Sequence, residues 1–414
     1  MPSFRIVHAD LYTLQVSPAA GGRVPEATVV VKDGAIAWVG PDGHAPKADV
    51  TIDARGRVVT PGWIDCHTHL VFAGERARDY RRRAEGATYK ELAAESGGIL
   101  STVRATRAAT EDALEQSAAE RLVRFLARGV TTIEAKSGYG LGVEDELKIL
   151  RAQKRAAARS AVEVESTFLG AHAIPPEFHD APDRYVDLIV AEMLPRVQAE
   201  GLARFCDVFV EGGFFTADQA RRILGEASAR GMKPKLHADQ MSAGGGAELA
   251  AELGAVSADH LEHASDAGLL ALARAGTVAV LLPGASLFLG DELPHAKRFR
   301  DAGVKIALST DFNPGTSPTD DLALMGTLAM SRMGMTSEEA LAAVTINAAA
   351  AIARPDLGLL APGCQADLVL WDAPTLEHLF WHFGTPHAAM VFKRGNVVFE
   401  RDTSPECRPK FPAN

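Results

Sequence analysis

Short apolar runs alternate with helical patterns along the middle of the chain. The runs have the length and composition of buried strands, and most segments between them carry apolar residues at three- and four-residue spacing, which is typical of helices. Gly129, Gly231, Gly254 and Gly276 lie where helix C-caps are expected. The eight runs are VVTPGWIDCH, VTTIEAKS, VEVESTFLGAH, CDVFVEGG, KPKLHAD, AVSADHL, TVAVLLP and VKIALSTD. This alternation predicts βαβ units around a parallel sheet and, with eight strands, a (β/α)8 TIM barrel.

The two ends of the chain are rich in strand patterns instead. Asp33-Gly34 lies between two apolar runs and predicts a hairpin, and Arg394-Gly395-Asn396 lies where a second hairpin turn is expected. Each end is too short to bury a core alone. We therefore expect residues 1–58 and 361–414 to pair into one small β-sandwich domain, and residues 59–360 to form the barrel.

Composition and charge narrow the classes of partner. Lys and Arg number 43 against 53 Asp and Glu, so the formal net charge is -10. This balance gives no overall electrostatic reason to bind nucleic acid or an anionic membrane. No apolar run approaches the roughly 18 to 20 residues that span a bilayer, and Arg5, His8 and Asp10 interrupt the segment where a signal peptide would be apolar. With only four cysteines, widely separated, the sequence predicts a cytoplasmic protein with reduced thiols.

Reactive side chains collect at the predicted strand ends. His67 and His69 are two residues apart at the end of the first run, so both imidazoles can point to one metal ion. His237 ends the fifth run, His260 the sixth and Asp311 the eighth. Because barrel active sites lie at the C-terminal ends of the strands, these groups should meet at the barrel mouth. Imidazole and carboxylate ligands favour Zn2+ or Fe2+ over Mg2+ or Ca2+.

Several blocks of the sequence carry a resemblance to a known group of enzymes. The segment PGWIDCHTHL, the two later strand-end histidines and STDFNPG resemble the amidohydrolase superfamily of metal-dependent hydrolases. The match is closer to those members that open the ring of 4-imidazolone-5-propanoate to N-formimidoyl-L-glutamate in histidine degradation. The blocks behind this closer resemblance are VFAGER, GATYKEL, GGILSTVRATR, TIEAKSGYGL, STFLGAHAIPPE, HADQMSAGGGAELAAELGAVSADHLEH and STDFNPGTSP.

The resemblance implies roles for individual residues. It implies that one Zn2+ or Fe ion is bound by His67, His69, His237 and Asp311. It implies that the substrate is held by Arg76, Tyr139, His172, Gln240 and Thr316, and that Tyr139, Asn313 and Gly315 contact the ring-opened product. The Arg76 guanidinium suits a propanoate carboxylate because its fork can bind both oxygens. Some relatives have Glu at the position of Gln240, and because Gln cannot act as a general base, a proton-transfer role there is in doubt.

Some alternatives stay open from the sequence. Either Asp311 or His260 can carry the proton to the departing ring nitrogen. Lys136 follows the second predicted strand, which is not where a metal-bridging lysine stands in two-metal relatives, so we expect a single metal. We expect Cys66 to be a small buried residue facing away from the site, and His263 to lie at the surface or behind the site. Rival functions are a nucleobase deaminase and a catalytically inactive ligand-binding barrel. A homodimer is expected from the frequency of such assemblies.

Overall fold

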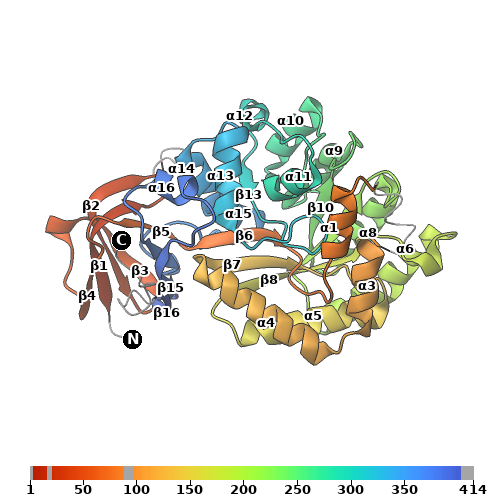
Figure 1. Ribbon diagram of the computed structural model, residues 1–414, viewed down its shortest axis with the longest axis horizontal. Helices are drawn as coiled ribbons and strands as arrows, with labels where there is room; N and C mark the ends of the chain where they lie inside the picture. Colours follow the sequence, from red (N-terminus) through yellow and green to blue (C-terminus); the bar gives the residue numbers. More distant parts are fainter. Residues whose placement is uncertain (1–2, 16–20, 88–96, 402–414) are drawn as a thin grey trace, which may run out of the picture.

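The computed structural model has two parts, a barrel and a sheet built from both chain ends, and describes residues 3–15, 21–87 and 97–401. Figure 1 shows the terminal sheet on the left and the barrel, surrounded by helices, on the right. The predicted fold class is confirmed. The domain boundaries stay a prediction, and the last predicted residues, 402–414, lie outside the described ranges.

The barrel consists of parallel strands that follow one another in chain order. Beyond the last strand, a bridge between Thr68 and Phe312 joins the end of the sheet to its beginning, and His69 N donates to Phe312 O at 2.8 Å. Each of the eight predicted runs contains one of these strands. The strands are β6 (Trp63–Thr68), β7 (Val130–Lys136), β8 (Glu163–Ala171), β9 (Phe205–Val210), β10 (Lys233–Ala238), β11 (Ser257–His260), β12 (Val278–Leu281) and β13 (Ile306–Leu308).

Helices connect these strands and cover the barrel. The four expected C-cap glycines all have positive φ. Thr110 lies between two consecutive helices, Ile99–Ala108 and Glu111–Ala127, and its side chain caps the second of them. The α-helices are α1 (Ala77–Ala84), α3 (Ile99–Ala108), α4 (Glu111–Ala127), α5 (Val143–Ala158), α6 (Pro182–Leu188), α7 (Leu194–Ala199), α8 (Ala217–Ala229), α9 (Gly246–Glu252), α10 (Asp266–Ala275), α11 (Pro283–Leu289), α12 (Ala296–Ala302), α13 (Leu322–Arg332), α14 (Ser337–Ala343), α15 (Ile346–Ala351) and α16 (Leu376–Trp381). Short 3-10 turns span Asp42–His44 and Pro176–Phe178, and a π-turn spans Ile189–Met193.

The terminal sheet combines strands from both ends of the chain, as expected. Its order is β16-β15-β14-β5-β1-β2-β3, and β4 pairs with β1 beside β5. The branched sheet folds over, because Phe4 on β1 stacks on Phe392 on β15 at 5.1 Å although two strands separate these elements. A hydrophobic core therefore lies between the two layers of the folded terminal sheet. The strands are β1 (Phe4–Tyr12), β2 (Arg23–Lys32), β3 (Ala35–Pro41), β4 (Val50–Asp53), β5 (Val58–Pro61), β14 (Leu368–Trp371), β15 (Ala388–Lys393) and β16 (Asn396–Glu400).

The first predicted run is two strands rather than one. Its beginning, β5, pairs with β1 and β14 in the terminal sheet, and β6 starts the barrel after Gly62. A Cβ at Gly62 would lie 2.3 Å from Thr131 Oγ1, so the chain crosses between the two parts where only glycine fits. The Trp63 and Trp371 rings then pack 4.4 Å apart and join the N-terminal end of β6 to the terminal sheet.

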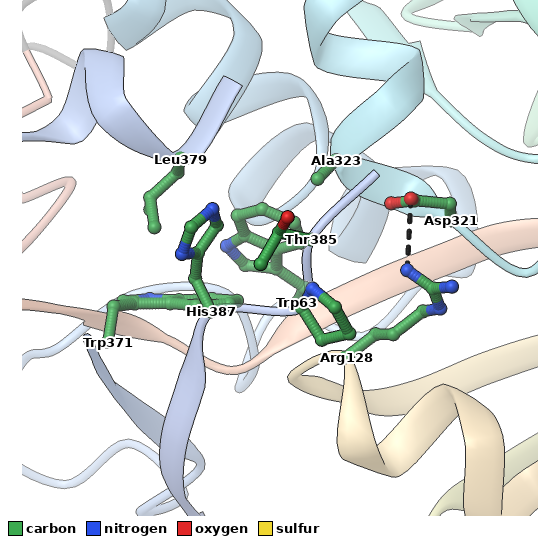
Figure 2. A pocket seen from close by; sticks show the side chains of 9 residues that line it. Trp63, Arg128, Asp321, Ala323, Trp371, Leu379, Thr385 and His387 are labelled. Carbon is green, nitrogen blue, oxygen red and sulfur yellow. Dashed lines mark ion pairs between the residues drawn. The ribbon is translucent and has the colours of Figure 1, made fainter. Parts of the chain in front are cut away.

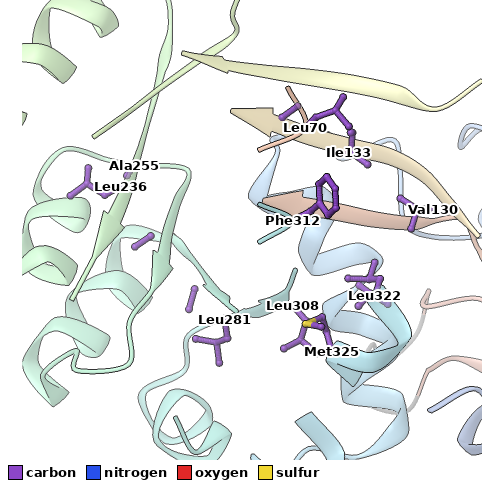
Figure 3. Close-up of a cluster of buried hydrophobic side chains, with 14 of the residues drawn as sticks. Leu70, Val130, Ile133, Leu236, Ala255, Leu281, Leu308, Phe312, Leu322 and Met325 are labelled. Carbon is purple, nitrogen blue, oxygen red and sulfur yellow. The ribbon is translucent and has the colours of Figure 1, made fainter. Parts of the chain in front are cut away.

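The main hydrophobic core lies between the outer faces of the barrel strands and the helices. Figure 3 shows part of it, with Leu308 of β13 beside Met325 of α13. Cys66 is fully buried in a smaller apolar cluster with Ile64 and Val280, as expected. Since side chains alternate along a strand, charged residues occupy the opposite, inner face. Within the described residues, none of the helices is both long and apolar enough to cross a bilayer.

Candidate metal centre and substrate site

Three histidines from two distant parts of the sequence converge at the C-terminal end of the barrel. His67 lies near the end of β6, His69 directly follows that strand, and His237 lies on β10. The His67 ring centroid is 4.6 Å from that of His237 and 5.5 Å from that of His69. All three side chains are buried. The structure therefore brings together the three histidines that the sequence places at strand ends.

Asp311 completes this group. Its Oδ1 lies 3.4 Å from His67 Nε2 and 3.6 Å from His69 Nε2. The Asp311 N–H donates to His67 O at 3.1 Å, which fixes the residue against the first barrel strand. Asp311 and His260 both have positive φ, 51° and 78°, a backbone conformation that side chains other than glycine rarely adopt and that concentrates at functional sites.

Two buried carboxylates set the tautomers of the ligand histidines. His67 Nδ1 donates to Asp259 Oδ2 at 2.7 Å, and His237 Nδ1 lies 3.0 Å from Asp207 Oδ2. A carboxylate accepts hydrogen bonds, so His67 Nδ1 carries a hydrogen. His237 Nδ1 forms no hydrogen bond among the described residues, but the negative charge of Asp207 beside it favours a hydrogen on that nitrogen too. Each Nε2 can then offer its lone pair to a metal. His67 Nε2 and His237 Nε2 are both buried and have no hydrogen-bond partner among the described residues. A metal ion fits these orphaned nitrogens.

Lys136 lies behind these carboxylates rather than beside the ligands. It is the last residue of β7, not a residue beyond the strand, and its Nζ is 2.7 Å from Asp207 Oδ2 and 3.2 Å from Asp259 Oδ2. A third contact joins Nζ to Glu134 Oε1 at 2.9 Å. The positive charge of Lys136 helps to hold the pKa values of Asp207 and Asp259 below the usual range, against the effect of burial.

Two of the three ligand histidines, His69 and His237, have lowered pKa values that suit metal binding. Burial, together with the charges of neighbouring histidines, lowers the pKa of His69 well below its usual range, and burial lowers the pKa of His237. His67 differs. Burial and Lys136 lower its pKa, but Asp259 and Asp311 outweigh them and raise it to about 9. A metal that binds His67 must therefore displace a proton.

Two further histidines border the ligand group. His260 ends β11, and its ring centroid is 5.3 Å from that of His237 and 5.7 Å from that of His67. His172 follows β8 and stacks on His69 at 4.9 Å. Both could take part in a metal group with the histidines they border. His263 is exposed, in agreement with the expected surface position.

Tyr139 and His172 face the same space from neighbouring loops. The Tyr139 ring is 5.6 Å from His69 and 5.4 Å from His172. Burial and the Asp311 carboxylate raise the pKa of Tyr139, so its phenol keeps its proton and can donate. Burial lowers the pKa of His172 to about 3. Because His172 Nδ1 must donate to Gly138 O at 3.0 Å, its Nε2 can only accept a hydrogen bond.

Arg76 lies at the rim of a cavity of about 560 Å³. Its Nε donates to Asp79 Oδ2 at 2.9 Å, which leaves the terminal nitrogens available. A Cβ at Gly315 would lie only 2.2 Å from Arg76 Nη1. Arg76 and Gly315, which the resemblance assigns to substrate and product, are thus in direct contact although they are far apart in the sequence.

The loop after Asp311 is held together by Asn313. Asn313 Oδ1 accepts from the backbone N–H groups of Gly315 and Thr316, both at 2.8 Å, and Asn313 Nδ2 donates to Asp311 O at 2.6 Å. Thr316 Oγ1 lies 3.4 Å from Asp311 Oδ2. Gln240 is half-buried beyond β10. The binding roles assigned to Gln240, Asn313 and Thr316 stay predictions.

The sequence analysis assigned no role to several buried charged residues. Glu146, on α5, accepts from the N–H groups of Gly138, Gly140 and Leu141 and so fixes the loop that carries Tyr139. Asp207 contacts the ligand His237, and Lys136 in turn contacts Asp207. The sequence did contain a sign of these roles, because charged residues within otherwise apolar strand runs must be paired when they are buried.

Comparisons with known proteins agree with this arrangement. The amidohydrolase family model matches residues 58–398. The imidazolonepropionase of Geobacillus kaustophilus is 50% identical over 386 residues, 91% of each chain, and that of Anaeromyxobacter dehalogenans is 47% identical over 413 residues, 97% of each chain.

Solved structures of lower sequence identity share the fold. The 5-methylcytosine deaminase of Klebsiella pneumoniae has a TM-score of 0.76 at 18% identity, covering 99% of this chain and 100% of that one. A variant of atrazine chlorohydrolase from Arthrobacter aurescens, complexed with zinc and atraton, has a TM-score of 0.73 at 17% identity, covering 96% and 95%. The family model and the relatives near 50% identity together show that the chain belongs to the amidohydrolase family, in the branch of the imidazolonepropionases.

Proposed function

We propose that the barrel-mouth site hydrolyses the ring carbon–nitrogen bond of 4-imidazolone-5-propanoate, giving N-formimidoyl-L-glutamate. Imidazolonepropionase activity is the function that the relatives near 50% identity support, and it makes the chain a hydrolase of a cyclic amide. The observation that carries the proposal is the buried group of three histidines and Asp311, in which carboxylates contact the ligand histidines. Tyr139 packs beside His69, and Arg76 contacts Gly315 in the loop that follows Asp311.

One metal ion, Zn2+ or Fe2+, is held by His67, His69, His237 and Asp311 in this proposal. The donor set of imidazole nitrogens and one carboxylate suits either ion, and the orphaned Nε2 atoms of His67 and His237 support it. Such an ion lowers the pKa of a water molecule and polarises an amide carbonyl. Asp259 and Asp207 keep the ligand nitrogens oriented.

The chain's own residues bind and orient the ring. Arg76 binds the propanoate carboxylate through its terminal nitrogens. The protonated phenol of Tyr139 donates to an oxygen of the ring or its product, and neutral His172 accepts from a ring N–H through Nε2. Asp311 is ionised, because the imidazole of His67, 3.4 Å away, and the charges of His67 and His260 outweigh burial and hold the pKa of Asp311 below its usual range. Asp311 therefore accepts a proton from water and returns it to the departing nitrogen, with His260 as the alternative carrier.

Product analysis tests this function against its nearest rival. Purified protein incubated with 4-imidazolone-5-propanoate should form N-formimidoyl-L-glutamate without release of ammonia, as followed by mass spectrometry. Release of ammonia from a nucleobase, with no ring opening of the imidazolone, would make the protein a deaminase. Metal analysis of the same preparation decides between zinc and iron, and light scattering tests the expected homodimer. A cytoplasmic location stays a prediction.

Metal affinity should rise with pH in the metal-free protein. His67 must lose one proton on binding, whereas the lowered pKa values of His69 and His237 mean that these ligands are already neutral. Loss of one proton predicts about a tenfold gain per pH unit up to about pH 9, followed by a plateau. Titration against a competing chelator between pH 7 and pH 10 measures this. A flat profile would show that His67 is already neutral.

Arg76→Ala should raise KM by about 10- to 100-fold, because a charge-assisted pair to the substrate carboxylate is lost. The kcat should fall as well, since this remote contact also orients the ring. Steady-state kinetics separate the two effects. Arg81→Ala, on the exposed face of α1, is the control and should behave like the wild type. Unchanged kinetics for Arg76→Ala would place the propanoate elsewhere.

Gly315→Ala should act through Arg76. The new methyl group would overlap Arg76 Nη1, so the guanidinium must move away from its position. A displacement of about 1 Å in a substrate-positioning group can cost on the order of 100-fold in kcat/KM. Gly212→Ala is the matched control, because a Cβ there meets nothing within 4 Å. If both variants keep wild-type kcat/KM, Gly315 has no part in placing Arg76.

A further inference from the structure

A second group of three histidines lies far from the barrel mouth. His378 is on α16, His382 directly follows that helix, and His387 directly precedes β15. One ligand nitrogen from each lies within 4.8 Å of the other two, and the ring centroids are 5.1 to 5.5 Å apart. We propose that His378, His382 and His387 form a second site for a divalent transition metal. The bound metal would link the end of α16 to His387, which directly precedes β15.

The chain brings these side chains together by simple local geometry. His378 and His382 are four residues apart, so they lie on the same side of the helix end, and His382 N donates to His378 O at 3.1 Å. His387 is fixed from the other side. Its backbone carbonyl accepts from Asp372 N at 2.8 Å. Figure 2 shows its imidazole standing between Trp371 and Leu379. The third histidine is thus preordered by the packing of the terminal sheet.

The tautomer of His387 is also set for metal binding. Its Nε2 lies 3.1 Å from His382 O, and because a carbonyl oxygen only accepts, Nε2 carries the hydrogen and Nδ1 keeps its lone pair. This is the arrangement by which a ligand histidine is oriented through its other nitrogen.

The three imidazole nitrogens determine which metal ions this site should prefer. Three imidazoles favour Zn2+, Cu2+ or Ni2+ over Mg2+ and Ca2+, which prefer oxygen. Within the described residues 3–15, 21–87 and 97–401, none of the three histidines forms an ion pair with a carboxylate. Arg401 donates to Pro386 O and places a positive charge nearby. We therefore expect weaker binding than at the barrel mouth, where a carboxylate is present.

The position of the group indicates a stabilising role. Phe380 of α16 stacks on Trp63 at 5.9 Å, and Trp63 begins β6, whereas His67 lies near the other end of the same strand. The three histidines therefore lie at the N-terminal end of the barrel, where side chains serve stability rather than catalysis. A metal there cross-links the connection between β14 and β15 and stabilises the folded state by binding to it.

Zn2+ binding to the enzyme that carries its barrel-mouth metal tests this proposal. Equilibrium dialysis with metal analysis should find one further equivalent of Zn2+ in the wild type. In the double variant His378→Ala, His382→Ala, the affinity for this equivalent should fall at least about 10-fold. Added Zn2+ should raise Tm in the wild type but not in the variant. Both proteins should keep the same turnover, since neither histidine touches the active site.

His179→Ala is the matched control, because His179 is an exposed histidine outside the group. It should bind the second equivalent like the wild type. Equal Zn2+ binding by the double variant and the wild type would overturn the proposal, as would the absence of a second equivalent in the wild type. Loss of binding in the control as well would also overturn it, because binding would then follow surface histidines in general.

Discussion

Asp311→Asn should lower kcat by at least about 1000-fold while the protein stays folded. The amide cannot accept the proton that the Asp311 carboxylate takes from water, and it offers a poorer metal ligand than a carboxylate oxygen. The left-handed backbone at this position is no obstacle, because Asn tolerates positive φ at least as well as Asp. The measurements are kcat, metal content and Tm for the same preparation.

The control for Asp311→Asn is Asp291→Asn, the same chemical change at an exposed residue. This variant should match the wild type in all three measurements. If Asp311→Asn keeps near wild-type turnover with metal bound, Asp311 does not carry the proton and His260 becomes the carrier. If it loses both turnover and metal, its role as a ligand outweighs its role as a base.

Lys136→Met should lower the free energy of unfolding by about 3–5 kcal/mol. The substitution removes the ammonium group between Asp207, Asp259 and Glu134 and leaves buried carboxylates that repel one another. Since Asp207 and Asp259 orient His237 and His67, metal affinity should also fall by about 10- to 100-fold. Urea unfolding and chelator competition measure the two effects.

Lys235→Met provides the matched control for Lys136→Met. Lys235 is also fully buried in the barrel, but its Nζ has no hydrogen-bond partner among the described residues and lies 3.6 Å from Glu134 Oε1. Among the described residues it forms no ion pair with Asp207 or Asp259, but its charge also helps to lower the pKa of Asp259, so metal affinity should fall less than in Lys136→Met. Equal losses of metal affinity in the two variants would mean that buried charge in general, rather than the link from Lys136 to the ligand histidines, is responsible.

Local patterns were enough to predict the strands, the hairpin turns and the convergence at the barrel mouth. Both predicted hairpin turns have positive φ, at Asp33-Gly34 and at Arg394-Gly395. His67, His69, His237 and Asp311 could be grouped in advance because parallel strands of a barrel end on one face. Each of these inferences needs only the alternation of side chains and the chemistry of turn residues.

Features that depend on contacts between distant segments could not be predicted. Pro61-Gly62 is a local sign of a break within the VVTPGWIDCH run, but it does not show that β5 leaves the barrel sheet; its partners β1 and β14 decide this. The role of Lys136 could not be predicted, because its partners Asp207 and Asp259 come from β9 and β11, and only the assembled barrel brings them together. The approach of Arg76 to Gly315 is likewise a property of the folded loops.

The position of β5 between β1 and β14 has a consequence for how the chain acquires its structure during synthesis. Trp371 Nε1 donates to Thr60 Oγ1 across 311 positions of sequence, so the edge of β5 that faces β14 stays unpaired until almost the whole polypeptide has left the ribosome, although β1 can already cover the other edge. Such non-local pairing slows folding. A chain that stops before β14 would leave this apolar edge open to other molecules, and we expect prematurely terminated products to aggregate rather than persist as free barrels.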